Sequence, residues 1–177
     1  MKLFPALILL TTLSSFGTLN CSLIDWSVGR KLSWSDFKAS PDKNSLNAAL
    51  TGTNIKFDFS YNSETGFKYH IYCQFDKNSS WGKVKTDYIL AHEQGHFDIA
   101  EIYARKLCKA FREYQPDIEK ANKEVNKLYD NLMKQLTEAQ KQYDYETQNS
   151  INTAGQKKWL KQINDDLESL RDYADYH

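Results

Sequence analysis

Alternating apolar and polar side chains in the middle of the chain predict two β-strands. Aromatic or aliphatic residues stand at every second position over residues 55–61 and again over residues 67–75. The segment NSETG at residues 62–66 lies between the two runs and has turn-forming composition. We therefore expect an antiparallel hairpin whose aromatic face packs against another element.

The apolar spacing changes to three and four residues near position 85, which predicts helices from there onward. A first helix should run to about Tyr114, because Gln115 and Pro116 break the pattern. Asp117 can cap a long second helix that reaches about Tyr143. The second helix carries one apolar stripe, made of Ile118, Ala121, Val125, Leu128, Leu132, Leu136 and Ala139. A last amphipathic helix carries Trp159, Ile163, Leu167 and Leu170.

These elements together predict a small α+β domain. A hairpin or small antiparallel sheet packs on the first helix, and the long helix and a C-terminal helix follow. The chain has 177 residues, which suits one domain over residues 21–177 preceded by a short leader.

The first 20 residues have the pattern of a secretory signal peptide. A positive charge at Lys2 is followed by a short apolar run and by small residues near Gly17. Pro5 and the tail rich in Thr and Ser argue against a buried helix, and the run is too short to span a bilayer. Cys21 stands where a bacterial lipoprotein would carry its lipid, and plain cleavage near Gly17 is the alternative.

Export would place the protein in the periplasm, on the outer membrane as a lipoprotein, or outside the cell. In these compartments Cys73 and Cys108 can form a disulfide, with two buried thiols as the alternative. The 23 basic and 23 acidic residues cancel, which disfavours nucleic acid and anionic membranes as partners. The hydrophobic share of 41% excludes a disordered chain.

The segment HEQGH at residues 92–96 carries the chemistry. It is an HExxH motif on a predicted helix, which is the zincin signature. Residues i and i+4 lie on one helix face, so His92 and His96 can bind one metal ion. Glu93 is offset from that face and can take a proton from water bound to the metal. The alternative, two histidines that only make hydrogen bonds in a buried helix face, does not explain the intervening Glu93.

A zinc peptidase needs a third protein ligand, and the same helix does not supply it. At about 100° per residue, Asp98 lies about 120° and Glu101 about 180° around the helix from His92. The third ligand must therefore come from another element.

Four residues elsewhere are candidates for the third ligand. His70 lies on the polar side of its strand, and Asp130 lies among polar residues of the long helix, so solvent exposure explains both. Asp144 and Glu146 are better placed, because polar groups clustered where a helix ends often line a site. A frayed, solvated helix end is the alternative for this pair.

Several segments resemble successive motifs of one family of exported bacterial proteins. That family is described either as of unknown function or as secreted zinc-dependent proteases. The matching segments are WSDF at residues 34–37, NAALT at 47–51, SW at 80–81 and LAHEQGHFDIAE at 90–101. The resemblance covers nearly all of the chain after the leader, and its most specific part surrounds His92. It implies a zincin-like metallopeptidase domain, with the hairpin beside the metal-binding helix.

The resemblance continues near the end of the long helix, where the family pattern looks like Tyr-Asp-x-x-Thr-x-His-Gly. Tyr143, Asp144 and Thr147 match this pattern, but Asn149 and Ser150 stand where His and Gly are expected. If that His is the family's third ligand, then Asp144, Glu146 or a water held by Asn149 must replace it here. A zincin-like arrangement also implies that an exposed strand edge, with residues 67–75 as the candidate, binds an extended peptide.

The sequence thus predicts an exported zinc metallopeptidase acting on a peptide or protein substrate. Zn²⁺ held by His92, His96 and either Glu146 or Asp144 would polarise the scissile carbonyl and its bound water. Glu93 would serve as the general base and pass the proton to the leaving amine. The alternative is a catalytically weak or inactive scaffold of the cell envelope that keeps a structural metal site. Asn149 favours that alternative, whereas Glu93 disfavours it.

Overall fold

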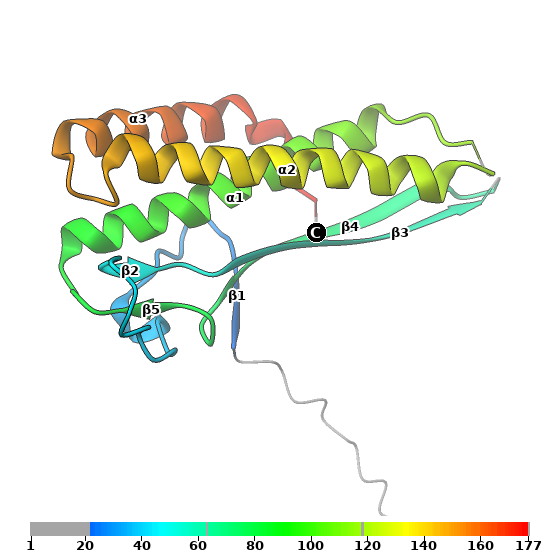
Figure 1. Ribbon diagram of the computed structural model, residues 1–177. Helices are drawn as coiled ribbons and strands as arrows, with labels where there is room; N and C mark the ends of the chain where they lie inside the picture. The colour runs from blue at the N-terminus through cyan, green and yellow to red at the C-terminus, as the bar shows by residue number, and fades with distance from the viewer. Residues whose placement is uncertain (1–21, 63, 118, 177) are drawn as a thin grey trace, which may run out of the picture.

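The computed structural model describes residues 22–62, 64–117 and 119–176. The leader at residues 1–20 and Cys21 lie outside the described residues, as does Ile118. The rest forms an α+β fold in which three helices stack on small antiparallel sheets, as the sequence predicted (Figure 1). Among the described residues, no helix has the length and apolar character needed to span a membrane.

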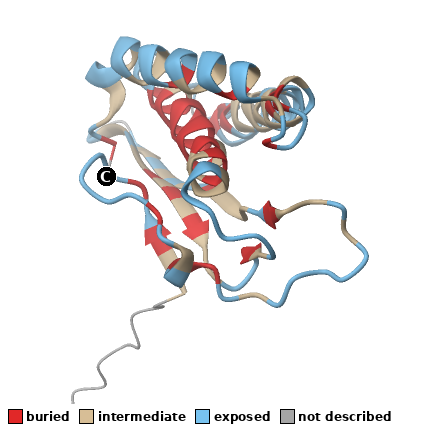
Figure 2. Ribbon diagram, turned by 90° about the vertical axis from the view of Figure 1, so that its left-hand side faces the viewer, coloured by how far each residue is buried: buried red, intermediate tan, exposed pale blue. Residues whose placement is uncertain are grey.

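Helix α1, Asp87–Glu113, is the central element of the fold. Fifteen of its 27 residues are buried, against four of 27 in α2 (Ala121–Thr147) and two of 17 in α3 (Thr153–Ser169). Figure 2 shows the same contrast, with a mostly buried α1 beneath helices whose outer faces are exposed. Because α1 lies between the other helices and the sheet, both of its sides find partners. The site-bearing helix is therefore held in place by the whole core.

The predicted hairpin is present and pairs along its full length. Strand β3 (Thr53–Asn62) runs antiparallel to β4 (Gly66–Asp76), in a register that places Asn62 opposite Gly66. Gly66 has a φ of +70°, which a residue without a Cβ adopts at little cost. The aromatic face packs on the helices, where the Phe57 ring lies 5.4 Å from Phe111 of α1 and 4.9 Å from Tyr129 of α2.

Strand β4 is the central strand of its sheet, so the prediction that residues 67–75 offer an edge for peptide binding is wrong. Strand β3 covers one side, and β1 (Leu23–Asp25) pairs with the far end of the other, giving the order β1-β4-β3. The Cys73 carbonyl also accepts from Trp26, and the Ile71 amide donates to the Tyr176 carbonyl. Local alternation identified the strand but gave no information on its neighbours.

A second, two-stranded sheet forms from β2 (Ala49–Leu50) and β5 (Trp81–Gly82). The Ser80 hydroxyl donates to the Asp76 carbonyl at 2.6 Å and accepts from the Gly52 amide at 2.9 Å. The 3₁₀ turn η1 (Trp34–Asp36) packs its tryptophan ring against Gly82, where a Cβ would approach the ring to 2.7 Å. Three of the motif segments noted in the sequence therefore build this small sheet and its support.

Helix α2 begins and ends later than the sequence predicted. The Asp117 side chain accepts from the Glu119 amide in a turn that precedes the helix, and Lys120 takes the N-cap position. At the other end the helix continues through Thr147, and Gln148 adopts a left-handed φ of 51°. A short turn, η2 (Arg171–Tyr173), follows α3.

Charged side chains buried on α1 have partners that explain why they are tolerated. Asp98 accepts from Trp26 Nε1 at 2.7 Å and from Gln94 Nε2 at 2.8 Å. Glu101 accepts from Arg105 Nε at 2.8 Å and from the Tyr176 hydroxyl. Both carboxylates are thus engaged away from His92, as the helical geometry predicted.

The two cysteines predicted either to pair or to remain buried thiols are both buried and free. Cys73 lies beside Glu101, and burial raises its thiol pKa well above the usual value. Cys108 lies two turns further along α1, with Sγ 3.5 Å from the Tyr69 hydroxyl. The thiols therefore occupy separate places in the core.

Leucine truncation should confirm that α1 carries the core. Leu107 is fully buried on α1, whereas Leu46 is fully exposed in the loop before β2. We expect Leu107→Ala to lower the free energy of unfolding by about 2–5 kcal/mol. The matched variant Leu46→Ala should change it by less than about 0.5 kcal/mol. Urea unfolding followed by circular dichroism measures both, and equal effects would contradict the central role of α1.

Candidate metal centre

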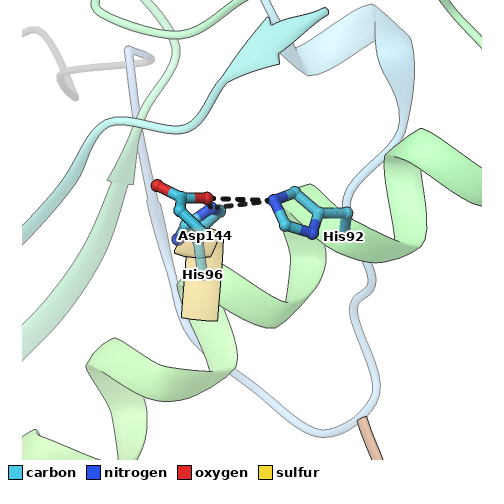
Figure 3. A group of neighbouring side chains, drawn as sticks. All are labelled: His92, His96 and Asp144. Carbon is cyan, nitrogen blue, oxygen red and sulfur yellow. Dashed lines mark hydrogen bonds and ion pairs between the residues drawn. The ribbon is translucent and has the colours of Figure 1, made fainter. Parts of the chain in front are cut away.

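Two helices bring three potential ligands together. His92 and His96 lie one turn apart in the first half of α1, and Asp144 comes from the last turn of α2 (Figure 3). Asp144 Oδ1 lies 3.2 Å from His92 Nε2 and 3.0 Å from His96 Nε2, and the two nitrogens are 3.2 Å apart. These three residues form a group that could hold a metal ion.

The ligand triangle has the size needed to bind one metal ion. A metal about 2.0–2.1 Å from each atom would see angles of about 91–106° between them, which lie between the octahedral and the tetrahedral values. The side chains of His92 and His96 are 4% and 14% exposed, whereas that of Asp144 is 38% exposed. The two histidines are therefore buried against α1, whereas the side of the group near Asp144 is accessible. A further ligand can approach the metal position from that side.

Asp144 and His96 each shift the pKa of the other so that the charged form is favoured. Burial opposes ionisation of Asp144, but its hydrogen bonds with His92 and His96 lower its pKa below the usual value. Burial likewise opposes a charged His96, yet the Asp144 carboxylate raises the pKa of His96. These directions describe the metal-free site, where the carboxylate stays ionised and attracts positive charge, whether a proton or a metal.

Residues of α2 hold both histidine rings. The Tyr143 ring stacks on His92 with centroids 4.5 Å apart, and its hydroxyl donates to the His92 carbonyl at 3.2 Å. Gln140 Nε2 donates to the His96 carbonyl at 2.9 Å, and its Oε1 is hydrogen-bonded to His96 Nδ1. Gln140, Tyr143 and Asp144 are spaced by three and four residues, so one face of α2 makes all these contacts.

Gly95 allows the two helices to approach closely enough for these contacts. A Cβ at Gly95 would lie 2.4 Å from the Tyr143 hydroxyl oxygen, which is closer than a Cβ approaches a nonbonded atom in proteins. The glycine inside HEQGH therefore serves packing between helices, although glycine lowers helix propensity by about 1 kcal/mol.

Glu93 lies beside the three potential ligands, and a residue outside α1 and α2 holds its side chain in place. Its Oε2 accepts from the Thr51 hydroxyl at 2.7 Å, and Thr51 directly follows β2. Burial raises the pKa of Glu93, although the nearby His96 and the bond from Thr51 act in the opposite direction. The carboxyl group is thus fixed in position and is more basic than an exposed glutamate.

A cavity of about 480 Å³ opens over the group. His92, Glu93 and His96 line its α1 side, residues 47–53 form one wall, and α2 forms the other. The α2 wall presents Leu136, Thr137, Gln140, Lys141 and Asp144. The volume is within the range of small-molecule and peptide sites, and the metal ligands lie inside it.

The structure distinguishes the candidates for the third ligand. Asp144 joins the histidines, whereas Glu146 is bound at the surface, accepting from Gln142 Nε2 at 2.6 Å and from Trp159 Nε1 at 2.7 Å. The His70 ring lies tilted against Tyr72 on the hairpin, with centroids 4.4 Å apart, and Asp130 is exposed on α2. None of these three belongs to the group around His92.

Asn149 and Ser150 are among the residues that line the cavity. Both have positive φ values, 51° and 72°, in the turn that leads from α2 to α3. Such conformations cost energy for residues with a Cβ, and they often occur at functional sites. Asn149 and Ser150 therefore line the cavity, and Asp144 supplies the carboxylate beside the histidines.

Sequence reasoning missed the supporting roles of Thr51, Gln140 and Tyr143. Gln140 could have been found from its spacing, because it lies one turn before Asp144 on the same helix face. The glycine at position 95 was a second signal, since a glycine inside a helix often marks a close approach. Thr51 gave no signal beyond its place in a family motif, because its contact with Glu93 spans 42 positions in the sequence.

Comparison with known proteins identifies a family but no characterised relative. Neither the curated proteins nor the solved structures contain a significant match. A family model described as "Bacterial protein of unknown function (DUF922)" matches residues 29–151. This match spans most of the chain and includes all three potential ligands, Glu93 and both walls of the cavity. The chain therefore belongs to the DUF922 family of bacterial proteins of unknown function.

Proposed function

We propose that this protein is a zinc metallopeptidase that hydrolyses peptide bonds. The observation that carries the proposal is the placement of Glu93 in the same cavity as the His92, His96 and Asp144 triangle. Three ligands with an accessible fourth side are typical of catalytic zinc sites, whereas structural zinc sites have four protein ligands. The spacing of His92, Glu93 and His96 is also the HExxH pattern typical of zinc peptidases.

The same donor set also suits iron, so the choice of metal needs an argument. Two histidines and one carboxylate bind Fe(II) in oxygenases as well as Zn²⁺ in hydrolases. Glu93 favours zinc, because an oxygenase has no need for a carboxylate base held next to the metal.

The residues have separate roles in the proposed reaction. Zn²⁺, when bound, would act as a Lewis acid that polarises the scissile carbonyl and the attacking water. Glu93 takes a proton from the water and gives it to the leaving amine, and burial makes its carboxylate a better base. Thr51 holds Oε2 of Glu93, which leaves Oε1 to handle the proton. Asp144 completes the ligand set and adds negative charge that favours a cation.

The cavity wall supports an extended peptide as substrate. Residues 47–53 line the cavity, and β2 within this segment pairs with β5 alone among the strands of the described residues. We expect a substrate main chain to add to the other side of β2 as a further strand. This segment takes the place of residues 67–75 as the proposed peptide-binding edge.

We also propose that the protein is exported, as the sequence of its first 20 residues predicts. Mass spectrometry of the mature N-terminus tests this expectation.

Isosteric substitutions at positions 144 and 146 test the proposed ligand set. We expect Asp144→Asn to weaken zinc binding by more than about 100-fold, since loss of outer hydrogen-bond partners alone costs 10–100-fold. The matched variant Glu146→Gln should bind zinc like the wild type, because the Glu146 carboxylate contacts Gln142 and Trp159. Chelator competition with metal analysis measures both. Loss of zinc from Glu146→Gln, with Asp144→Asn intact, would reverse the assignment.

Replacing the proposed base tests the reaction. Glu93→Gln should retain stoichiometric zinc and lose at least about 100-fold in peptide hydrolysis, because general base catalysis contributes 10²–10⁴. Digestion of a broad peptide library, with and without a chelator, provides the assay. Unchanged activity in zinc-loaded Glu93→Gln would refute the proposed base. A wild-type protein that binds zinc but cleaves no peptide would instead support the alternative of an envelope scaffold with a structural metal.

A further inference from the structure

We propose that Gln140 is a positioning residue of the metal centre that fixes His96 in the form able to bind metal. The inference rests on the proposed metal binding by His92, His96 and Asp144, and it does not require peptidase activity. Gln140 touches no proposed ligand atom and acts through the far nitrogen of the His96 ring.

The two contacts of Gln140 determine the direction of its amide. The His96 carbonyl can only accept a hydrogen bond, so the amide group that faces it at 2.9 Å must be the donor, Nε2. The oxygen Oε1 then faces His96 Nδ1 and can only accept. Nδ1 must therefore carry the hydrogen.

This arrangement determines the state of the other ring nitrogen. In a neutral imidazole one nitrogen carries the hydrogen and the other carries a lone pair. With a hydrogen fixed on Nδ1, Nε2 is the nitrogen left to bind a metal. It faces Asp144 Oδ1 and His92 Nε2, where it can donate a hydrogen to the carboxylate or, once that hydrogen is released, give its lone pair to a metal ion. Gln140 thus presets the nitrogen that the ligand triangle requires.

Gln140 also restricts rotation of the ring. Without an acceptor at Nδ1, the ring could turn over or place its hydrogen on Nε2, and both changes remove a ligand from the site. Gln140 is half-buried, so water competes poorly for the bond. Because Gln140 precedes Asp144 by one turn, the same helix face supplies a ligand and orients another.

The second histidine is held by a different contact. His92 Nδ1 is buried and has no hydrogen-bond partner among the described residues, and its ring stacks on Tyr143. Of the two histidines, His96 is therefore the one whose ring is oriented by a hydrogen bond at Nδ1. Loss of the Gln140 acceptor should affect one ligand selectively.

Three variants separate this role from a purely structural one. Gln140→Met removes both hydrogen bonds at similar volume, and Gln140→Glu keeps an acceptor for Nδ1 but cannot donate to the His96 carbonyl. Gln135→Met is the matched control, because Gln135 is exposed on the same helix. Zinc dissociation constants come from chelator competition, and thermal melting of each metal-free variant monitors folding.

We expect Gln140→Met to bind zinc about 10–100-fold more weakly than the wild type. Gln140→Glu should bind at least as tightly as the wild type, and Gln135→Met should be unchanged. If Gln140→Met does not fold, Gln140→Leu takes its place. Wild-type affinity in the apolar variant, or equal weakening in Gln140→Glu, would overturn the proposal.

The same measurements distinguish the failure of this inference from the failure of the proposed function. A wild-type protein without measurable zinc affinity would contradict both the metal centre and the role of Gln140. A wild-type protein that binds zinc but cleaves no peptide would contradict only the peptidase proposal, and the Gln140 comparison would still be decisive.

Discussion

The close approach of α2 to α1 at Gly95 is the contact on which the candidate site depends. Any side chain at this position would collide with Tyr143 and push α2 outward. With glycine, Tyr143 stacks on His92, Gln140 reaches His96 and Asp144 completes the ligand triangle. The absence of a Cβ at Gly95 thus allows three residues of α2 to contact the two histidines of α1. The local loss of helix propensity is offset by the packing that it permits.

The centrality of α1 explains how the fold can hold such a polar site rigidly. This helix carries His92, Glu93, Asp98, Glu101 and Arg105 in buried positions, where unpaired polar groups would be costly. The acidic residues on its far side are satisfied by Trp26, Arg105 and Tyr176, which come from the helix itself and from both ends of the described chain. The face toward α2 and the small sheet is then left for chemistry. A rigid element that positions a site in this way limits the displacement of its ligands.

Periodicity and motif spacing in the sequence were sufficient to predict the α+β elements and the pair His92 and His96. The hairpin and the helices have strong local patterns, whereas β1, β2 and β5 have only two or three residues each and carry almost none. The sequence therefore could not show that β4 is a central strand or that residues 47–53 form a cavity wall. Those facts depend on pairing between distant segments.

The choice between Asp144 and Glu146 shows the same limit in the site. At about 100° per residue, the two lie about 80° to either side of Leu136, so the apolar stripe does not select one of them. The selection comes from the packing of Tyr143 against Gly95, which turns Asp144 toward the histidines and leaves Glu146 to Trp159. The role of Thr51 is likewise tertiary, because its partner Glu93 lies on another element.

Anomalous diffraction at the zinc absorption edge from crystals grown with Zn²⁺ tests the central claim most directly. We expect one strong peak about 2.0–2.1 Å from His92 Nε2, His96 Nε2 and an Asp144 carboxylate oxygen. The fourth side of that peak should open into the cavity beside Glu93. A peak elsewhere, a zinc ion without Asp144 as a ligand, or no peak at saturating zinc would contradict the account.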